Sequence, residues 1–233
     1  MRALVLCALA ACTYPDKELD GPFTCFGAQP ATTADPVVKL SGTTVDPSNL
    51  MPTAGVTLML QSAQMSTIFT TTTDAMGAFT FTLNTNGIPV AGVDLFASAI
   101  GRINTYYFPS RPISHDVSLV LSVISTSEAS ALAAGAGITN TAGDGTVLLT
   151  INDCNDAALA GAKLTSAPAG PIRYFDGIQP SMTATATDAG GVAMIANLPP
   201  GKATLNATVA GMTLPPHDVT VVANAFSLTE IQP

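Results

Sequence analysis

The second half of this chain repeats the first, so the sequence must fold into two similar units. An Asp begins each repeat, at Asp46 and at Asp153, and three short motifs then recur in the same order. Ala54-Gly55 matches Ala160-Gly161, Thr73–Gly77 matches Thr187–Gly191, and His115–Leu119 matches His217–Val221. Three matches in one order indicate a duplicated domain.

Short β-prone runs separated by turn residues lie between these motifs, which is the pattern of all-β sandwiches. Six runs of the first half are expected to be strands: Val37–Val45, Gly55–Leu60, Ser66–Thr73, Ala78–Leu83, Val93–Ala99 and Asp116–Ile124. In the Thr-Asp-x-x-Gly motif, the Asp can accept hydrogen bonds from nearby amides and the Gly tolerates positive φ, so the motif reverses the chain. Ser127 is expected to cap a short helix that runs through Ala134 and stops at Gly135.

These motifs carry a resemblance to a known family. An Ala-Gly pair before an apolar strand, Thr-Asp-x-x-Gly, and Leu-Pro-Pro-Gly at Leu198–Gly201 resemble the carboxypeptidase regulatory-like domain family. The resemblance covers Val37–Ile124 and Gly145–Pro233; the first half has Asn86–Pro89 where the second has Leu-Pro-Pro-Gly. It implies an all-β chain of two tandem Greek-key β-sandwich domains, transthyretin-like or immunoglobulin-like. Members are accessory modules that act as spacers, as adhesion or assembly domains, or as glycan binders.

The N-terminus has the pattern of a cleaved export signal. A basic start at Arg2 precedes an apolar run, and Leu-Ala-Ala-Cys at Leu9–Cys12 looks like a bacterial lipobox. A buried N-terminal strand or helix is the alternative. We therefore predict a signal peptide at 1–11, an extended tether at 12–36, sandwich domains at 37–126 and 143–233, and a short helical connector at 127–142. The start, the tether and Cys25 resemble delta-proteobacterial lipoproteins.

The lipobox implies that Cys12 is acylated, for example with palmitate, and that the chain is anchored in a membrane of the cell envelope. Thr13 stands after Cys12 in place of Asp, which by resemblance to enterobacterial lipoproteins favours the outer membrane or cell surface. Cys25 and Cys154 remain for one disulfide in an oxidising compartment, or for two separate buried thiols. Metal binding is disfavoured because the sequence has no Cys-x-x-Cys and no Cys-His cluster.

Charge and motif content argue against several function classes. The net charge is −8 with no basic run, so nucleic acid is not an expected partner. The sequence has no nucleophile elbow, P-loop or dinucleotide fingerprint, and its two histidines, His115 and His217, do not form a zinc-peptidase motif. We expect no catalytic residue, no cofactor and no metal. The run Asn152–Asp156 could offer oxygen ligands to Ca²⁺, but a strand-connecting turn is favoured.

The sequence is compatible with three functional hypotheses. The favoured one is a non-catalytic envelope lipoprotein with a structural or interaction role. A carbohydrate-binding surface module is the first alternative and would need Tyr106, Tyr107 and Tyr174, the candidate ligand-binding residues, exposed on one face. An accessory subunit of an envelope complex is the second, and predicts an apolar patch or an unprotected edge strand. The partner would be a protein or a glycan at the cell surface.

Overall fold

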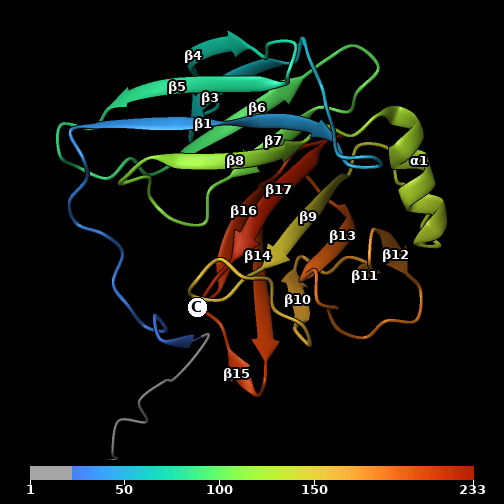
Figure 1. The fold of residues 1–233 in the computed structure, drawn as a ribbon. Helices are drawn as coiled ribbons and strands as arrows, with labels where there is room; N and C mark the ends of the chain where they lie inside the picture. Colours follow the sequence, from blue (N-terminus) through green and yellow to red (C-terminus); the bar gives the residue numbers. More distant parts are fainter. Residues whose placement is uncertain (1–22) are drawn as a thin grey trace, which may run out of the picture.

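A computed structural model describes residues 23–233, which form seventeen strands and one helix (Figure 1). The strands of the first half are β1 (Val37–Asp46), β2 (Met51–Pro52), β3 (Thr57–Ser62), β4 (Thr67–Thr72), β5 (Ala78–Asn84), β6 (Val93–Ser98), β7 (Thr105–Phe108) and β8 (Val117–Ser122). The helix α1 (Thr126–Gly135) precedes β9 (Gly145–Ile151), β10 (Lys163–Ala167), β11 (Ile172–Asp176), β12 (Gln179–Ser181), β13 (Val192–Leu198), β14 (Gly201–Val209), β15 (Met212–Thr213), β16 (His217–Val221) and β17 (Phe226–Ile231). The predicted all-β sandwich class is confirmed.

All six predicted runs of the first half contain a strand, but the helix cap was misplaced by two residues. Ser125, not Ser127, is the N-cap: its hydroxyl accepts from the Glu128 amide at 3.1 Å, and the Glu128 carboxylate accepts from the Ser125 amide at 2.7 Å. This reciprocal pair needs Glu three residues after the cap, a condition that Ser127 does not meet. No helix among residues 23–233 is long and apolar enough to cross a membrane.

One nine-stranded sheet runs through both halves, in the order β12-β11-β13-β9-β17-β7-β6-β3-β4. The join is β17, which lies parallel to β9 on one side and to β7 on the other, so that Leu228 is opposite Leu148 and Tyr107. No pattern in the sequence indicates this join. A last strand that pairs with both halves makes the two sandwiches a single continuous body (Figure 1).

Two four-stranded sheets pack on opposite faces of this shared sheet. β2, β1, β5 and β8 form one, and β10, β14, β15 and β16 form the other. Tyr107 and Leu228 pack against the core of the first half, whereas Phe108 and Ile231 pack against the core of the second. Neighbouring residues of a strand point to opposite faces, so the two cores lie on opposite sides of β7 and β17.

The duplication is visible in hydrogen bonds as well as in sequence. Thr73 Oγ1 accepts from the Val56 amide at 3.0 Å, and Thr187 Oγ1 accepts from the Ala162 amide at 3.0 Å. Each amide belongs to the residue that follows the Ala-Gly pair of its half. The first two motifs therefore occupy equivalent positions and tie the same two segments together in each half.

The glycine that ends the turn motif is required in both halves. Gly77 and Gly191 have φ of +70° and +65°. A Cβ atom would lie 2.6 Å from the main-chain oxygen of Thr44 at Gly77, and 2.7 Å from that of Ile151 at Gly191. The positive φ and the close backbone contact together leave room for glycine alone.

The third match, in contrast, pairs strands that are not equivalent, and this part of the sequence interpretation was wrong. His115 precedes β8, which lies parallel to β1, but His217 begins β16, which lies antiparallel to β14. The strand of the second half that lies parallel to the opening strand β9 is β17. The two segments look alike because each has polar residues before a strand in which apolar and polar residues alternate. That pattern is common to many strands and does not distinguish one from another.

The predicted disulfide joins Cys25 to Cys154, with an S–S distance of 2.11 Å and Cα atoms 5.5 Å apart. Cys154 lies in the loop after β9, so the bond ties the segment before β1 to the second half. That segment is also held to the first half, because the Ala34 amide donates to the Gly87 oxygen at 3.0 Å.

Candidate functional site: a cleft along a free strand edge

Strand β8 has a free edge within the described part of the chain. It pairs only with β1, by parallel hydrogen bonding. The Val123 amide donates to the Val45 oxygen at 2.9 Å, and alternate residues of a strand direct their backbone groups to the same side. The backbone groups of Ser118, Val120 and Ser122 therefore point away from β1. Within the described chain these outward backbone groups have no hydrogen-bond partner, and the Val120 side chain beside them is 73% exposed.

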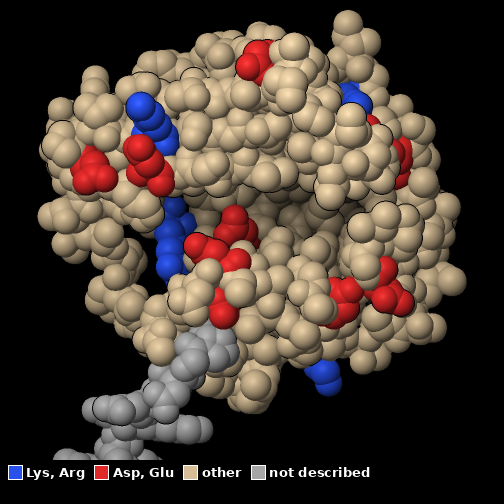
Figure 2. All heavy atoms as spheres, in the orientation of Figure 1, with Lys and Arg blue, Asp and Glu red and all other residues tan. Residues whose placement is uncertain are grey.

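A cleft runs along this edge, and its floor is the face of the shared sheet that α1 and the small sheets leave uncovered. One part, of about 290 Å³, is lined mainly by apolar side chains: Val120, Leu148, Phe175, Ile178, Val192 and Leu228. The adjoining part, of about 340 Å³, is lined by residues 117–119 and by polar side chains including Arg111, His115 and Asp156. Figure 2 shows the surface hollowed between the two halves, with acidic side chains beside the hollow.

Tyr107 and Glu230 line both parts of the cleft and form its polar centre. The Tyr107 hydroxyl donates to Glu230 Oε1 at 3.0 Å, and Asn152 Nδ2 donates to Oε2 at 3.5 Å. Burial, followed by the charge of Glu230, raises the pKa of Tyr107 well above its ordinary value, so this hydroxyl stays a donor. The three side chains come from β7, β17 and the loop after β9, which only the shared sheet brings together.

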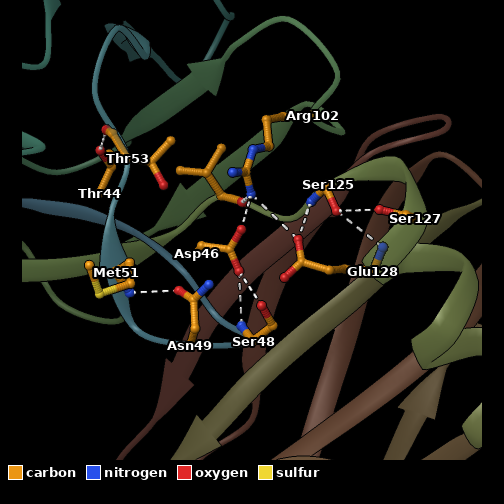
Figure 3. A network of polar contacts seen from close by, with 11 residues as sticks. Thr44, Asp46, Ser48, Asn49, Met51, Thr53, Arg102, Ser125, Ser127 and Glu128 are labelled. Atoms are coloured by element: carbon orange, nitrogen blue, oxygen red, sulfur yellow. Dashed lines mark hydrogen bonds and ion pairs between the residues drawn. The ribbon is translucent and has the colours of Figure 1, made fainter.

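Arg102 holds the turn after β1, and Pro47 of that turn lines the apolar part of the cleft (Figure 3). Its guanidinium lies 2.8 Å from the Asp46 carboxylate and 3.4 Å from the Glu128 carboxylate. The Ser48 amide and hydroxyl both donate to Asp46, at 3.1 and 2.6 Å. The pKa of Asp46 lies well below its ordinary value. The largest cause is the hydrogen bond with the Glu128 carboxyl group, followed by those with the Ser48 hydroxyl and Arg102. The network joins the turn after β1 to the start of α1.

The structure does not bring the three candidate tyrosines together. Tyr174 is 7% exposed, and its hydroxyl accepts from the Leu164 amide at 2.8 Å in the core of the second half. Tyr106 and Tyr107 are neighbours on β7 and point to opposite faces. Tyr106 packs against Phe96 and Phe108, with ring centroids 4.8 and 6.3 Å away. Only Tyr107 belongs to the cleft.

The polar residues weighed for metal binding have structural partners. His217 Nε2 lies 2.7 Å from Thr229 Oγ1, and burial lowers the pKa of His217 below its ordinary value. Asp153 Oδ1 accepts from the amides of Asn155 and Ala157, at 2.7 and 2.9 Å, which makes the 152–156 segment a turn. Residues 23–233 contain no group of three or more His, Cys, Asp or Glu side chains placed to hold a metal ion. Cys12 lies outside the described residues.

One buried acid was missed by the sequence reading. Asp94 is 3% exposed and lies opposite Gln61 in the pairing of β6 with β3. Asp94 Oδ2 and Gln61 Oε1 both lack a hydrogen-bond partner, and burial raises the pKa of Asp94 to about 6. The signal was a charged residue inside the predicted strand Val93–Ala99, where it was passed over.

Comparison with known proteins found distant structural neighbours. No protein-family model and no curated protein matches the chain. Among solved structures, the Bacillus anthracis TIE protein is 16% identical with a TM-score of 0.29, over 83% of this chain and 33% of that one. A streptococcal ancillary pilin is 12% identical with a TM-score of 0.27, over 84% and 62% of the two chains. The shaft pilin SpaA of Lactobacillus rhamnosus GG is 11% identical with a TM-score of 0.27, over 87% and 98%.

The chain thus spans about a third of the Bacillus anthracis protein's length. At such identities and TM-scores the likeness carries no argument about fold or function.

Proposed function

We propose that the protein is a non-catalytic interaction module that binds an extended peptide segment by strand addition to β8. The observation that carries this proposal is a free strand edge that borders an apolar floor. An unprotected edge strand is the feature that the sequence analysis required of an accessory subunit in an envelope complex.

The geometry of the cleft suits a single strand. The edge offers three N–H and three C=O groups, from Ser118, Val120 and Ser122, each able to contribute about 0.5–1.5 kcal/mol in a hydrogen bond. Alternate side chains of the added strand would then face Leu148 and Leu228 on the floor. Ile178, in the turn between β11 and β12, lines the same part of the cleft, whose volume of about 290 Å³ fits one extended segment better than the edge of another sheet.

A proline at the edge tests this proposal. Val120→Pro removes an N–H that faces away from β1, so the pairing of β8 with β1 and the fold should survive. The probe is a fluorescein-labelled eight-residue peptide in which valine alternates with threonine, and the readout is fluorescence anisotropy. We expect Val120→Pro to weaken binding about tenfold or more and the matched Val120→Ala variant, which keeps the N–H, to weaken it much less. Equal binding by both variants would refute strand addition at β8.

We also propose that the chain is anchored by acylation of Cys12 at the outer membrane or cell surface. Support comes from the Leu9–Cys12 lipobox and from the Cys25–Cys154 disulfide, since such bonds persist in oxidising compartments. The intact mass of protein extracted from membranes should match an acylated chain that begins at Cys12. An unmodified mass that starts at Met1 would rule the anchor out.

The equivalent turns at Thr73–Gly77 and Thr187–Gly191 support a further assignment, that each half is a carboxypeptidase regulatory-like domain. A structural match between either half, taken alone, and members of that family tests it. A better match to an unrelated sandwich family would overturn it.

A further inference from the structure

We propose that the strand bound along β8 carries a lysine or arginine that faces Glu230, with an apolar side chain at the next floor-facing position on the side of Leu228. This inference rests on the proposed strand addition and names the chemistry of the partner. It starts from an acid that the fold holds in place where the apolar part of the cleft meets the polar part.

Glu230 is half-buried and its position is fixed, but its charge is not neutralised within residues 23–233. Both carboxylate oxygens accept hydrogen bonds from neutral donors, the Tyr107 hydroxyl and the Asn152 amide. The ion pairs found in the described structure involve other acids. Two neutral donors orient a carboxylate without cancelling its charge, so a cation brought to it gains both attraction and a charge-assisted hydrogen bond.

The cation that lines the same cleft is directed elsewhere. Arg111 Nη2 donates to the main-chain oxygen of Pro233 at 3.2 Å and lies 3.8 Å from Cys25 Sγ. A second acid, Asp156, lines the polar part of the cleft, and its charge also acts on Tyr107. The centre of the cleft is therefore negative, and a bound cation would complement it.

The position of the cation within the strand follows from the floor. Glu230 and Leu228 lie on the same face of β17, and Leu148 lies on the adjacent β9 directly opposite Leu228. An added strand directs every second side chain to that floor. A cation facing Glu230 thus has one apolar floor-facing neighbour two residues away, on the side of Leu228, and a neighbour over the polar part of the cleft on the other side, so the expected pattern is apolar, any, basic.

The experiment compares three labelled peptides with alternating valine and threonine, in which one central floor-facing valine is replaced by lysine, glutamine or glutamate. Wild-type protein should bind the lysine peptide about tenfold more tightly than the glutamine peptide, and the glutamate peptide most weakly. Glu230→Gln, which keeps an oxygen that accepts from Tyr107, should bind lysine and glutamine peptides alike. The control Asp35→Asn removes an exposed acid outside the cleft lining and should keep the lysine preference.

The outcomes separate the two proposals. Binding of all three peptides with equal affinity by the wild type would overturn the cationic preference and leave strand addition standing. A lysine preference that persists in Glu230→Gln would place the recognition elsewhere and also overturn it. If none of the three peptides binds, strand addition is refuted, and the preference for a cation is refuted with it.

Discussion

Replacing Asp94 with asparagine is expected to stabilise the protein at neutral pH but not at acid pH. Asp94 is 3% exposed, its Oδ2 has no hydrogen-bond partner, and burial raises the pKa of its carboxyl group to about 6 from 3.8. The folded state therefore binds this proton more tightly than the unfolded state does. The free energy of unfolding must fall as pH rises from about 4 to about 6, and it stays lowered above that range.

The size of the effect follows from the same two values. At 1.36 kcal/mol for each pKa unit, a rise from 3.8 to about 6 corresponds to about 3 kcal/mol at neutral pH, which we treat as an upper figure. Asparagine carries no charge to desolvate, so Asp94→Asn should gain about 1–3 kcal/mol at pH 7. Below pH 3.8 the wild type carries a protonated carboxyl in both states, and the gain should vanish.

Urea denaturation of wild type and Asp94→Asn at several pH values between 3.5 and 7.5 measures this dependence. The control Asp176→Asn removes one negative charge from an exposed site at the end of β11 and should change stability little at any pH. A variant that is less stable than wild type at pH 7, or a gain that is the same at pH 3.5 and pH 7, would refute the reasoning.

Two further predictions concern the connections that hold the halves together. Replacing Cys25 and Cys154 with alanine opens a loop with a sequence separation of 129. The chain-entropy model predicts that the free energy of unfolding, measured by urea denaturation, falls by up to about 5 kcal/mol. An unchanged free energy of unfolding would contradict this prediction. Gly77→Ala should lose at least about 1 kcal/mol more than Gly55→Ala, because both have φ near +70° but only Gly77 has a backbone oxygen within 2.6 Å of the new Cβ. Equal losses at the two glycines would show that the contact with Thr44 does not matter.

The strands and turns were open to prediction because their signals are local. The alternation of Ala78–Leu83 and the Thr73–Gly77 turn depend on neighbours in sequence, and the structure has them where the sequence indicates. β7 was missed because its four residues, Thr105–Phe108, are too few for a period to be visible. Its two tyrosines, Tyr106 and Tyr107, were instead candidate ligand-binding residues for the alternative function of carbohydrate binding.

The cleft could not be predicted because no local pattern encodes it. It exists because β17 pairs with β7 of the other half and so places Glu230 beside Tyr107, across 123 residues of sequence. An apolar strand with a free edge and one with a paired edge also look alike in sequence. What could have been noticed is Glu230 itself, a charge inside the last β-prone run of the chain.

The most direct test of the account is amide hydrogen exchange in β8, measured by NMR on the free protein and with the lysine peptide bound. We predict that the outward amides of Ser118, Val120 and Ser122 exchange fast in the free protein and become protected when the peptide binds. The inward amides of Leu119 and Leu121, bonded to β1, should be protected in both states. Outward amides that are already protected without peptide, or that stay unprotected with it, would contradict the claim that β8 receives a strand.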